Sequence, residues 1–136
     1  MSTKALWQNW LLRIDQKIKK KCCMEEGATN GCLIWQGAKK KSKRGPAYGV
    51  MSVNFPGHTK RKHVTVHRLA YMVAHPQARN EIMDIVGFEI SHLCHNSLCV
   101  NPQHLSREPH SENNSRRRCQ NSGECHGHGN YADCML

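Results

Sequence analysis

Two clusters of cysteine and histidine constrain the fold of this chain more than any other feature. The first cluster has the spacing Cys94-x4-Cys99-x4-His104. The second cluster lies near the C-terminus and comprises Cys119, Cys125, His126, His128 and Cys134. Zinc takes four tetrahedral ligands, mostly thiolate and imidazole, and loops this short can wrap several of them around one ion. Both clusters therefore predict structural zinc sites.

The composition gives a second reason to expect bound metal. Only 38% of the 136 residues are hydrophobic and 6% are aromatic, so a single domain of this length would have a thin core without another source of stability. The N-terminal stretch MSTKALWQNW has no basic segment followed by an apolar run, and no segment approaches the ~20 apolar residues of a membrane span. We therefore expect an intracellular protein, in the nucleus, whose reduced cysteines bind zinc instead of forming disulfides.

The fourth ligand of the first zinc site must come from outside the triplet. Cys32 is the best candidate, because it begins a predicted strand that can reach the site. The ligand set would then be three cysteines and one histidine, and it would join the predicted sheet to the later loop. Cys22 and Cys23 are left over, and we interpret them as free thiols.

The histidine ligand of the second site is a choice between two neighbours. His128 is preferred, because His126 and Gly127 give the chain room to turn after Cys125. His126, directly adjacent to a cysteine ligand, is the alternative. Either choice gives a closed site with three cysteines and one histidine.

Hydrophobic periodicity and turn residues predict an α+β chain with few helices. Helices are predicted at 3–21, 66–75 and 108–118. Strands are predicted at 32–37, 48–55, 64–66 and 87–94, and the first three are expected to form one small antiparallel sheet. Turn-like or linker-like segments are predicted at 22–31 and 77–88, and a tail from 119 to 136 needs metal to order it. We divide the chain into an N-terminal helix, 1–24, and one zinc-stabilised domain, 25–136.

The charge of the chain indicates its partner. The net charge is +10 and the isoelectric point is about 9.4, which points to nucleic acid. Two basic runs adjoin the predicted strands. They include Lys39, Lys40, Lys41, Lys43 and Arg44 in the first run, and Lys60, Arg61 and Lys62 in the second. A β-ribbon edged with such side chains fits a groove of double-stranded DNA, so we expect duplex DNA as the partner.

Two residues beside the zinc clusters are candidates for chemistry. A closed zinc site has no open position, so a reactive group must lie next to it. His92 ends a predicted strand two residues before Cys94, and neutral histidine is the usual general base near pH 7. Asn113 lies on the helix after the zinc loop, and an amide oxygen is a hard ligand suited to Mg²⁺. If strand, loop and helix fold back on one another, His92 and Asn113 face each other.

The run ISHLCHNSLCVNPQHL at 90–105, followed by ENN at 112–114 and the cysteine-rich tail, resembles the His-Cys box homing endonucleases. These belong to the ββα-metal, or His-Me finger, nucleases. The resemblance implies a small zinc-stabilised ββα-metal fold with an antiparallel basic sheet, over about 32–134. It also implies that His92 is the general base and that Asn113 binds the catalytic metal. A basic residue near the scissile phosphate would be Arg61, or else Lys60 or Lys62.

The function implied by this resemblance is metal-dependent hydrolysis of phosphodiester bonds in double-stranded DNA. The cofactors would be two structural zinc ions and one catalytic Mg²⁺ or similar divalent ion. A non-catalytic zinc-stabilised DNA-binding module is the alternative, but it would need neither His92 nor Asn113, and the presence of both favours the enzyme. A homodimer is compatible with the resemblance. Because the sequence stops two residues after Cys134, we do not expect its subunits to exchange a C-terminal arm.

Overall fold

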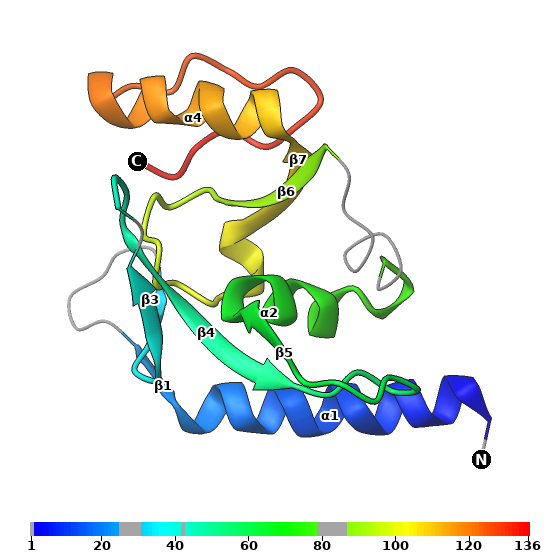
Figure 1. Ribbon diagram of the computed structural model, residues 1–136. Helices are drawn as coiled ribbons and strands as arrows, with labels where there is room; N and C mark the ends of the chain where they lie inside the picture. The colour runs from blue at the N-terminus through cyan, green and yellow to red at the C-terminus, as the bar shows by residue number, and fades with distance from the viewer. Residues whose placement is uncertain (1, 25–30, 42, 79–86) are drawn as a thin grey trace.

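The computed structural model describes residues 2–24, 31–41, 43–78 and 87–136. Within these residues the chain has three α-helices, two short 3-10 turns and several short antiparallel strands, which confirms the predicted α+β class (Figure 1). In chain order the elements are α1 (Thr3–Lys20), β1 (Cys22–Met24), β2 (Leu33–Trp35), β3 (Lys39–Lys41), β4 (Ala47–Val53), β5 (Lys62–Thr65), α2 (Val66–Ala74), η1 (Pro76–Ala78), β6 (Phe88–His92), η2 (Pro102–His104), β7 (Leu105–Pro109) and α4 (His110–Ser122).

Helix α1 forms for the reasons that its sequence predicts. The Ser2 side chain caps it by accepting a hydrogen bond from the backbone N–H of Ala5 at 3.1 Å, and three lysines lie in its last turn. One face is buried and packs on α2. This face consists of Trp7, Trp10, Leu11, Ile14 and Ile18. The helix is therefore fixed by an apolar stripe at helical spacing.

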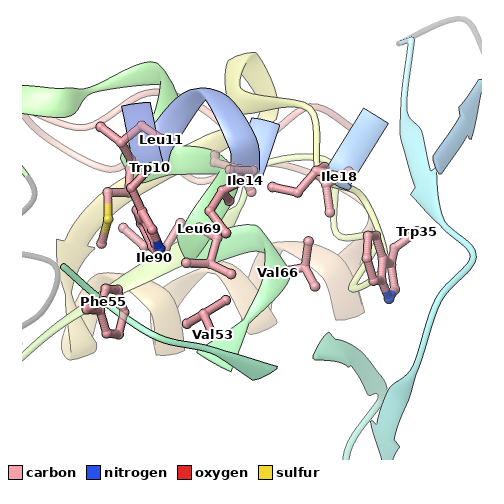
Figure 2. Close-up of a cluster of buried hydrophobic side chains, with 14 of the residues drawn as sticks. Trp10, Leu11, Ile14, Ile18, Trp35, Val53, Phe55, Val66, Leu69 and Ile90 are labelled. Atoms are coloured by element: carbon pink, nitrogen blue, oxygen red, sulfur yellow. The ribbon is translucent and has the colours of Figure 1, made fainter. Parts of the chain in front are cut away.

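The core is one cluster that spans the chain from α1 to β7 (Figure 2). The rings of Trp10 and Phe55 pack at an interplanar angle of 40° with centroids 5.1 Å apart, and Leu69 of α2 is fully buried in the same cluster. Trp35 lies against β4 at Gly49, where an added Cβ would come within 2.5 Å of the indole ring. A side chain at Gly49 would therefore push β4 away from the core.

The strands are arranged differently from the predicted single sheet. β3, β4 and β5 form an antiparallel sheet, with Lys40 opposite Tyr48 and Ser52 opposite His63. The predicted strand at 32–37 does not join this sheet, because β2 pairs with β1 instead. The interpretation of 22–31 as a turn region was wrong at 22–24, which form β1. The first basic run is also partly a strand, since Lys39–Lys41 form β3 and not a connection.

A hairpin and a helix form the unit that carries the candidate site. β6 and β7 pair antiparallel, with His92 opposite Leu105, and α4 follows directly at His110. The hydrophobic pattern does not predict β7, and the helix predicted at 108–118 begins at His110 in the structure. The reason is that Glu108 occupies a buried position, where an apolar residue would have revealed the strand. The helix also continues to Ser122, so Cys119 lies on α4 and not in the tail.

Two further expectations concern the predicted linker and membrane-spanning segments. The predicted linker at 77–88 falls mostly outside the described residues, which include only 77–78 and 87–88 of it. Among the helices of the described part, none is both long and apolar enough to cross a membrane.

Candidate active site and metal centres

The first cysteine–histidine group converges as the spacing predicts. The ligand atoms of Cys32, Cys94, Cys99 and His104 all lie within 4.8 Å of one another. The Nδ1 atom of His104 is 3.5 Å from the Sγ atoms of both Cys32 and Cys99. Three of the four residues are buried, and together they offer three sulfur donors and one imidazole nitrogen. This donor set fits a closed tetrahedral zinc site.

The backbone explains why Cys32 reaches that group from so far away in sequence. The segment after β6 runs along β2, and the N–H of Trp35 donates to the carbonyl of Leu98 at 2.9 Å. The N–H of Val100 likewise donates to the carbonyl of Leu33 at 2.8 Å. Cys32 immediately precedes β2 and is therefore held beside Cys99. The hydrogen bond between Cys94 and Cys99 lowers the pKa of the Cys99 thiol and raises the pKa of the Cys94 thiol, so Cys99 is the first of the two to become the thiolate that zinc binds.

The second group forms at the end of α4. The ligand atoms of Cys119, Cys125, His128 and Cys134 lie within 4.8 Å of one another. The Nε2 atom of His128 is 3.5 Å from Sγ of Cys119 and 3.3 Å from Sγ of Cys134. The donors are again three thiols and one imidazole. The two groups are therefore consistent with two zinc sites per chain.

His126, the alternative ligand, lies outside the second group. Its side chain is exposed, and its Nε2 atom is 3.1 Å from Oγ of Ser122. The Nδ1–H of the buried His128 instead donates to Oε2 of Glu112 at 2.8 Å, which leaves Nε2 free to face the thiols. A carboxylate that holds the outer nitrogen is the usual support of a metal-binding histidine. Glu112 was not predicted as part of this site, since no short ligand spacing links it to the cysteines.

Glu112 should therefore control the affinity of the second metal centre. We expect Glu112→Ala to weaken zinc binding there by about 10–100-fold, because the imidazole loses the group that orients it. Competition with a coloured chelator, recorded as two resolved zinc-release steps, measures this. Glu124→Ala is the matched control, because that exposed carboxylate lies next to Cys125 of the same metal centre. Equal zinc retention by the two variants would contradict the role of Glu112.

A cleft of about 680 Å³ lies beside the first metal centre, between β6, α2 and the start of α4. Its lining includes Tyr48, His67, Arg68, Glu89, His92 and Asn113. A smaller hollow of about 360 Å³ adjoins it and is lined among others by Arg44, Tyr48, His92, Asn113, Arg116 and Arg117. Tyr48, His92 and Asn113 line both. The structure thus brings the two residues predicted for chemistry to the junction of two hollows with arginine on either side.

His92 is held in a defined tautomer. Its Nε2 atom is 3.1 Å from the carbonyl oxygen of Cys99, which can only accept, so Nε2 carries the proton and Nδ1 is the nitrogen that can take one. Burial lowers the pKa of His92 to about 4, so the ring is neutral at pH 7. The His67 ring lies 4.4 Å from the His92 ring, centroid to centroid, and burial also lowers the pKa of His67. The loop of the first metal centre therefore orients a neutral imidazole in the cleft.

Asn113, on the first turn of α4, is held by the strand that carries His92. Its Oδ1 atom accepts a hydrogen bond from Oγ of Ser91 at 2.9 Å, and its Nδ2 donates to the Glu89 carboxylate. The imidazole of His110 donates to the other oxygen of Glu89. Amide and carboxylate oxygens are hard donors of the kind that Mg²⁺ prefers, so this side of the cleft fits a divalent ion.

The basic residues predicted to hold the scissile phosphate lie elsewhere. Arg61 is exposed and donates to Oγ and the carbonyl oxygen of Ser52 at 3.1 and 3.2 Å. Neither it nor Lys60 or Lys62 lines the cleft. Arg68 of α2 lines it instead, and burial lowers the pKa of that guanidinium from its usual value. The sequence does mark Arg68, because His67 and Arg68 interrupt an otherwise apolar helix.

The other predicted DNA-contacting residues are all solvent-exposed. They are Lys39, Lys40 and Lys41 on β3, Lys43 and Arg44 in the turn that follows, and Lys60 and Lys62 before and at the start of β5. Arg44 also lines the smaller hollow, so the first basic run reaches the junction where His92 lies.

Comparison with known proteins identifies the family. A family model described as the zinc-binding loop region of homing endonuclease matches residues 31–134, which include both cysteine–histidine groups, His92 and Asn113. No curated protein matches the chain, and no solved structure does. The match covers most of the sequence and agrees with the geometry of the two metal centres. The chain therefore belongs to the homing endonuclease family that this zinc-binding loop region defines, in the His-Me finger group.

Proposed function

We propose that this protein is a divalent-metal-dependent endonuclease that hydrolyses phosphodiester bonds of double-stranded DNA. The observation that carries the proposal is the position of His92 and Asn113 at the junction of two hollows, with Arg68 in one and Arg44 in the other. A cleft of this size with a base, a hard metal ligand and guanidinium groups suits the backbone of a nucleic acid.

His92 is the general base in this proposal. With the proton of its neutral ring on Nε2, the Nδ1 atom takes a proton from water, and the hydroxide attacks the phosphorus in line. The carbonyl of Cys99 then stabilises the imidazolium by accepting from Nε2. The first zinc loop has the role that the aspartate has in a catalytic triad, since it fixes the tautomer of the base.

Asn113 holds the catalytic metal in this proposal. Its Oδ1 atom would hold Mg²⁺ or a similar ion, which would supply positive charge to stabilise the leaving 3′ oxygen, and that oxygen takes its proton from solvent water. Arg68 is the group in the cleft suited to the non-bridging oxygens, because a guanidinium donates to two phosphate oxygens at once. Arg61 is then assigned, with Lys60 and Lys62, to contacts with the DNA backbone away from the reacting phosphate. The products carry a 5′ phosphate and a 3′ hydroxyl.

Incubation of supercoiled plasmid with zinc-loaded protein tests the activity. We expect nicked and linear products when Mg²⁺ is added and none in Mg²⁺-free buffer. Ligation of the products tests the chemistry of the ends. DNA binding without cleavage across Mg²⁺, Mn²⁺ and Ca²⁺ would favour the non-catalytic DNA-binding module.

We also propose that two copies act together as a homodimer, since one cleft reaches one strand at a time.

The exposed basic run of β3 and its turn should dominate affinity for duplex DNA. We expect Lys41→Glu or Arg44→Glu to weaken binding similarly for all sequences and to flatten the salt dependence, because each neutralised phosphate contributes about 0.9 to the slope of log affinity against log salt. Fluorescence anisotropy at several salt concentrations measures both quantities. Lys4→Glu on α1 is the charge-matched control. If the affinity for duplex DNA did not change with salt concentration, the assignment of this basic run to phosphate contacts would be wrong.

A further inference from the structure

The orientation of the Asn113 amide raises a chemical requirement that the cleft must meet. A primary amide has nearly the same shape when its oxygen and nitrogen exchange places, but only the oxygen binds a metal. If the group turned over, the NH₂ group would face the ion and the site would lose its protein ligand. Some neighbour must therefore distinguish the two ends of this side chain.

Glu89 is the neighbour that can make this distinction. An ionised carboxylate only accepts hydrogen bonds, and Glu89 accepts one from Nδ2 of Asn113. Ser91 is ambiguous, because a hydroxyl can donate to Oδ1, as it does here at 2.9 Å, or accept from an NH₂ group after a flip. Glu89 alone among these contacts thus requires that the nitrogen face it, with the oxygen on the other side.

The carboxylate of Glu89 is itself held in place from two directions. It lies on β6, three residues before His92, and β6 is paired with β7 opposite Glu108. His110, the first residue of α4, donates to the second carboxylate oxygen of Glu89, and the Glu89 side chain is 37% exposed. Strand β6 therefore carries both the candidate base and the group that orients the candidate metal ligand, and α4 is tied to that strand at the turn before Asn113.

We propose that Glu89 is a positioning residue that fixes the Asn113 amide with its oxygen toward the divalent ion and thereby sets the affinity of the cleft for that ion. The inference rests on the proposed function, because it deepens the role of the same cleft. The negative charge of Glu89 also favours ion binding, since it polarises the amide and makes Oδ1 a stronger ligand for the ion.

Two substitutions at Glu89 test this. Glu89→Ala removes the acceptor, and we expect it to weaken binding of the divalent ion by about 10–100-fold, the usual effect of removing a group that supports a metal ligand. Glu89→Gln keeps the size of the side chain and one acceptor oxygen but removes the charge and the obligation to accept, so we expect an intermediate loss. Asp15→Asn on α1 is the control for net charge, because its partner Lys19 lies outside the cleft.

The measurement uses zinc-loaded protein and two readouts. Electron paramagnetic resonance of free Mn²⁺ gives ion affinity without any need for catalysis, and the dependence of plasmid cleavage on Mg²⁺ concentration gives the same quantity during turnover. We expect the Mg²⁺ requirement of Glu89→Ala to rise in parallel with its loss of Mn²⁺ binding. At saturating Mg²⁺ much of its cleavage rate should return. Zinc content and duplex affinity should match the wild type.

The outcomes separate this inference from the proposed function. If Glu89→Ala and Glu89→Gln bind Mn²⁺ as tightly as the wild type, the positioning role is wrong, even if the protein cuts DNA. If the wild type binds Mn²⁺ in a Glu89-dependent way but cuts no DNA, the positioning role stands and the nuclease proposal fails. If Glu89→Ala loses zinc, the isosteric Glu89→Gln preserves packing, and its Mn²⁺ affinity then shows whether Glu89 positions Asn113.

Discussion

Replacing His92 with alanine is expected to lower the rate of DNA cleavage by about 10²–10⁴-fold, the usual contribution of a general base. The unprotonated nitrogen of the His92 imidazole, Nδ1, is fixed by the contact of the other ring nitrogen, since Nε2 donates to the Cys99 carbonyl. Single-turnover cleavage of plasmid at saturating Mg²⁺ measures the chemical step. Zinc content and duplex affinity should stay near wild-type values, because His92 belongs to neither cysteine–histidine group.

Neighbouring asparagines on α4 provide a matched control for the same site. Asn113 lines the cleft and should lose cleavage on replacement by alanine, whereas Asn114 is exposed and points about 100° away around the helix. Asn114→Ala should therefore cut DNA at the wild-type rate. Asn113→Asp should keep part of the activity, since a carboxylate also binds Mg²⁺.

A purely structural role for His92 predicts the reverse pattern. The His92→Ala protein would then lose thermal stability or zinc, and its cleavage rate would fall only in proportion to the folded fraction. A soluble, zinc-loaded His92→Ala protein that cleaves at the wild-type rate would overturn the assignment.

The local parts of this molecule could be read from the sequence. The helices at 3–20 and 66–74 follow from apolar spacing, and the grouping of Cys94, Cys99 and His104 follows from short loops around one ion. Cys32 could be placed because a predicted strand begins there, and in the structure β2 begins at the next residue. In each case the feature depends on neighbours in sequence or on one strong chemical preference, and such patterns survive in a single sequence.

The parts that the sequence hid depend on contacts between distant polar residues. Glu108 is buried in β7 only because Arg116 pairs with it, through Nε to Oε1 at 2.6 Å and Nη2 to Oε2 at 2.8 Å. Because both residues of this pair are charged, the end of β7 was predicted as the beginning of a helix. The link from Glu112 to His128 and the link from Glu89 to Asn113 are of the same kind. Hydrophobic patterning carries no information about such pairs, because either partner alone looks like a surface residue.

The pairing of the strands could not be predicted from the sequence either. The sequence predicts one strand at 32–37 followed by a basic connection, whereas the structure has two short strands, β2 and β3, and only β3 pairs with β4. β2 pairs with β1, while Trp35 packs over Gly49 of β4 and the backbone of β2 hydrogen-bonds to Leu98 and Val100. These are tertiary contacts with β4 and with the loop that carries Cys94 and Cys99, which sequence patterning does not reveal.

Removal of zinc is expected to abolish the fold. Binding of a structural zinc ion is worth about 10–16 kcal/mol, which equals or exceeds the total stability of about 5–15 kcal/mol of an ordinary domain. The first centre joins Cys32 before β2, the turn after β6 and His104 of η2, so its loss would separate the elements that position His92. We expect two zinc ions per chain by native mass spectrometry, and loss of the circular dichroism signal on chelation. Fewer than one zinc ion per chain would contradict both centres.

Single cysteine substitutions should divide this effect between the two centres. Cys99 is fully buried in the core region, so Cys99→Ser should unfold the whole domain, whereas Cys125→Ser should release only the segment after α4. The second variant should keep its core but lose most cleavage, because that segment holds α4, through Arg116 to the Ala132 carbonyl at 2.7 Å and to Cys134. Cys23→Ser is the control, since this exposed thiol belongs to neither group. If Cys99→Ser unfolded no more than Cys23→Ser, the first centre would have no part in holding the base of the proposed active site.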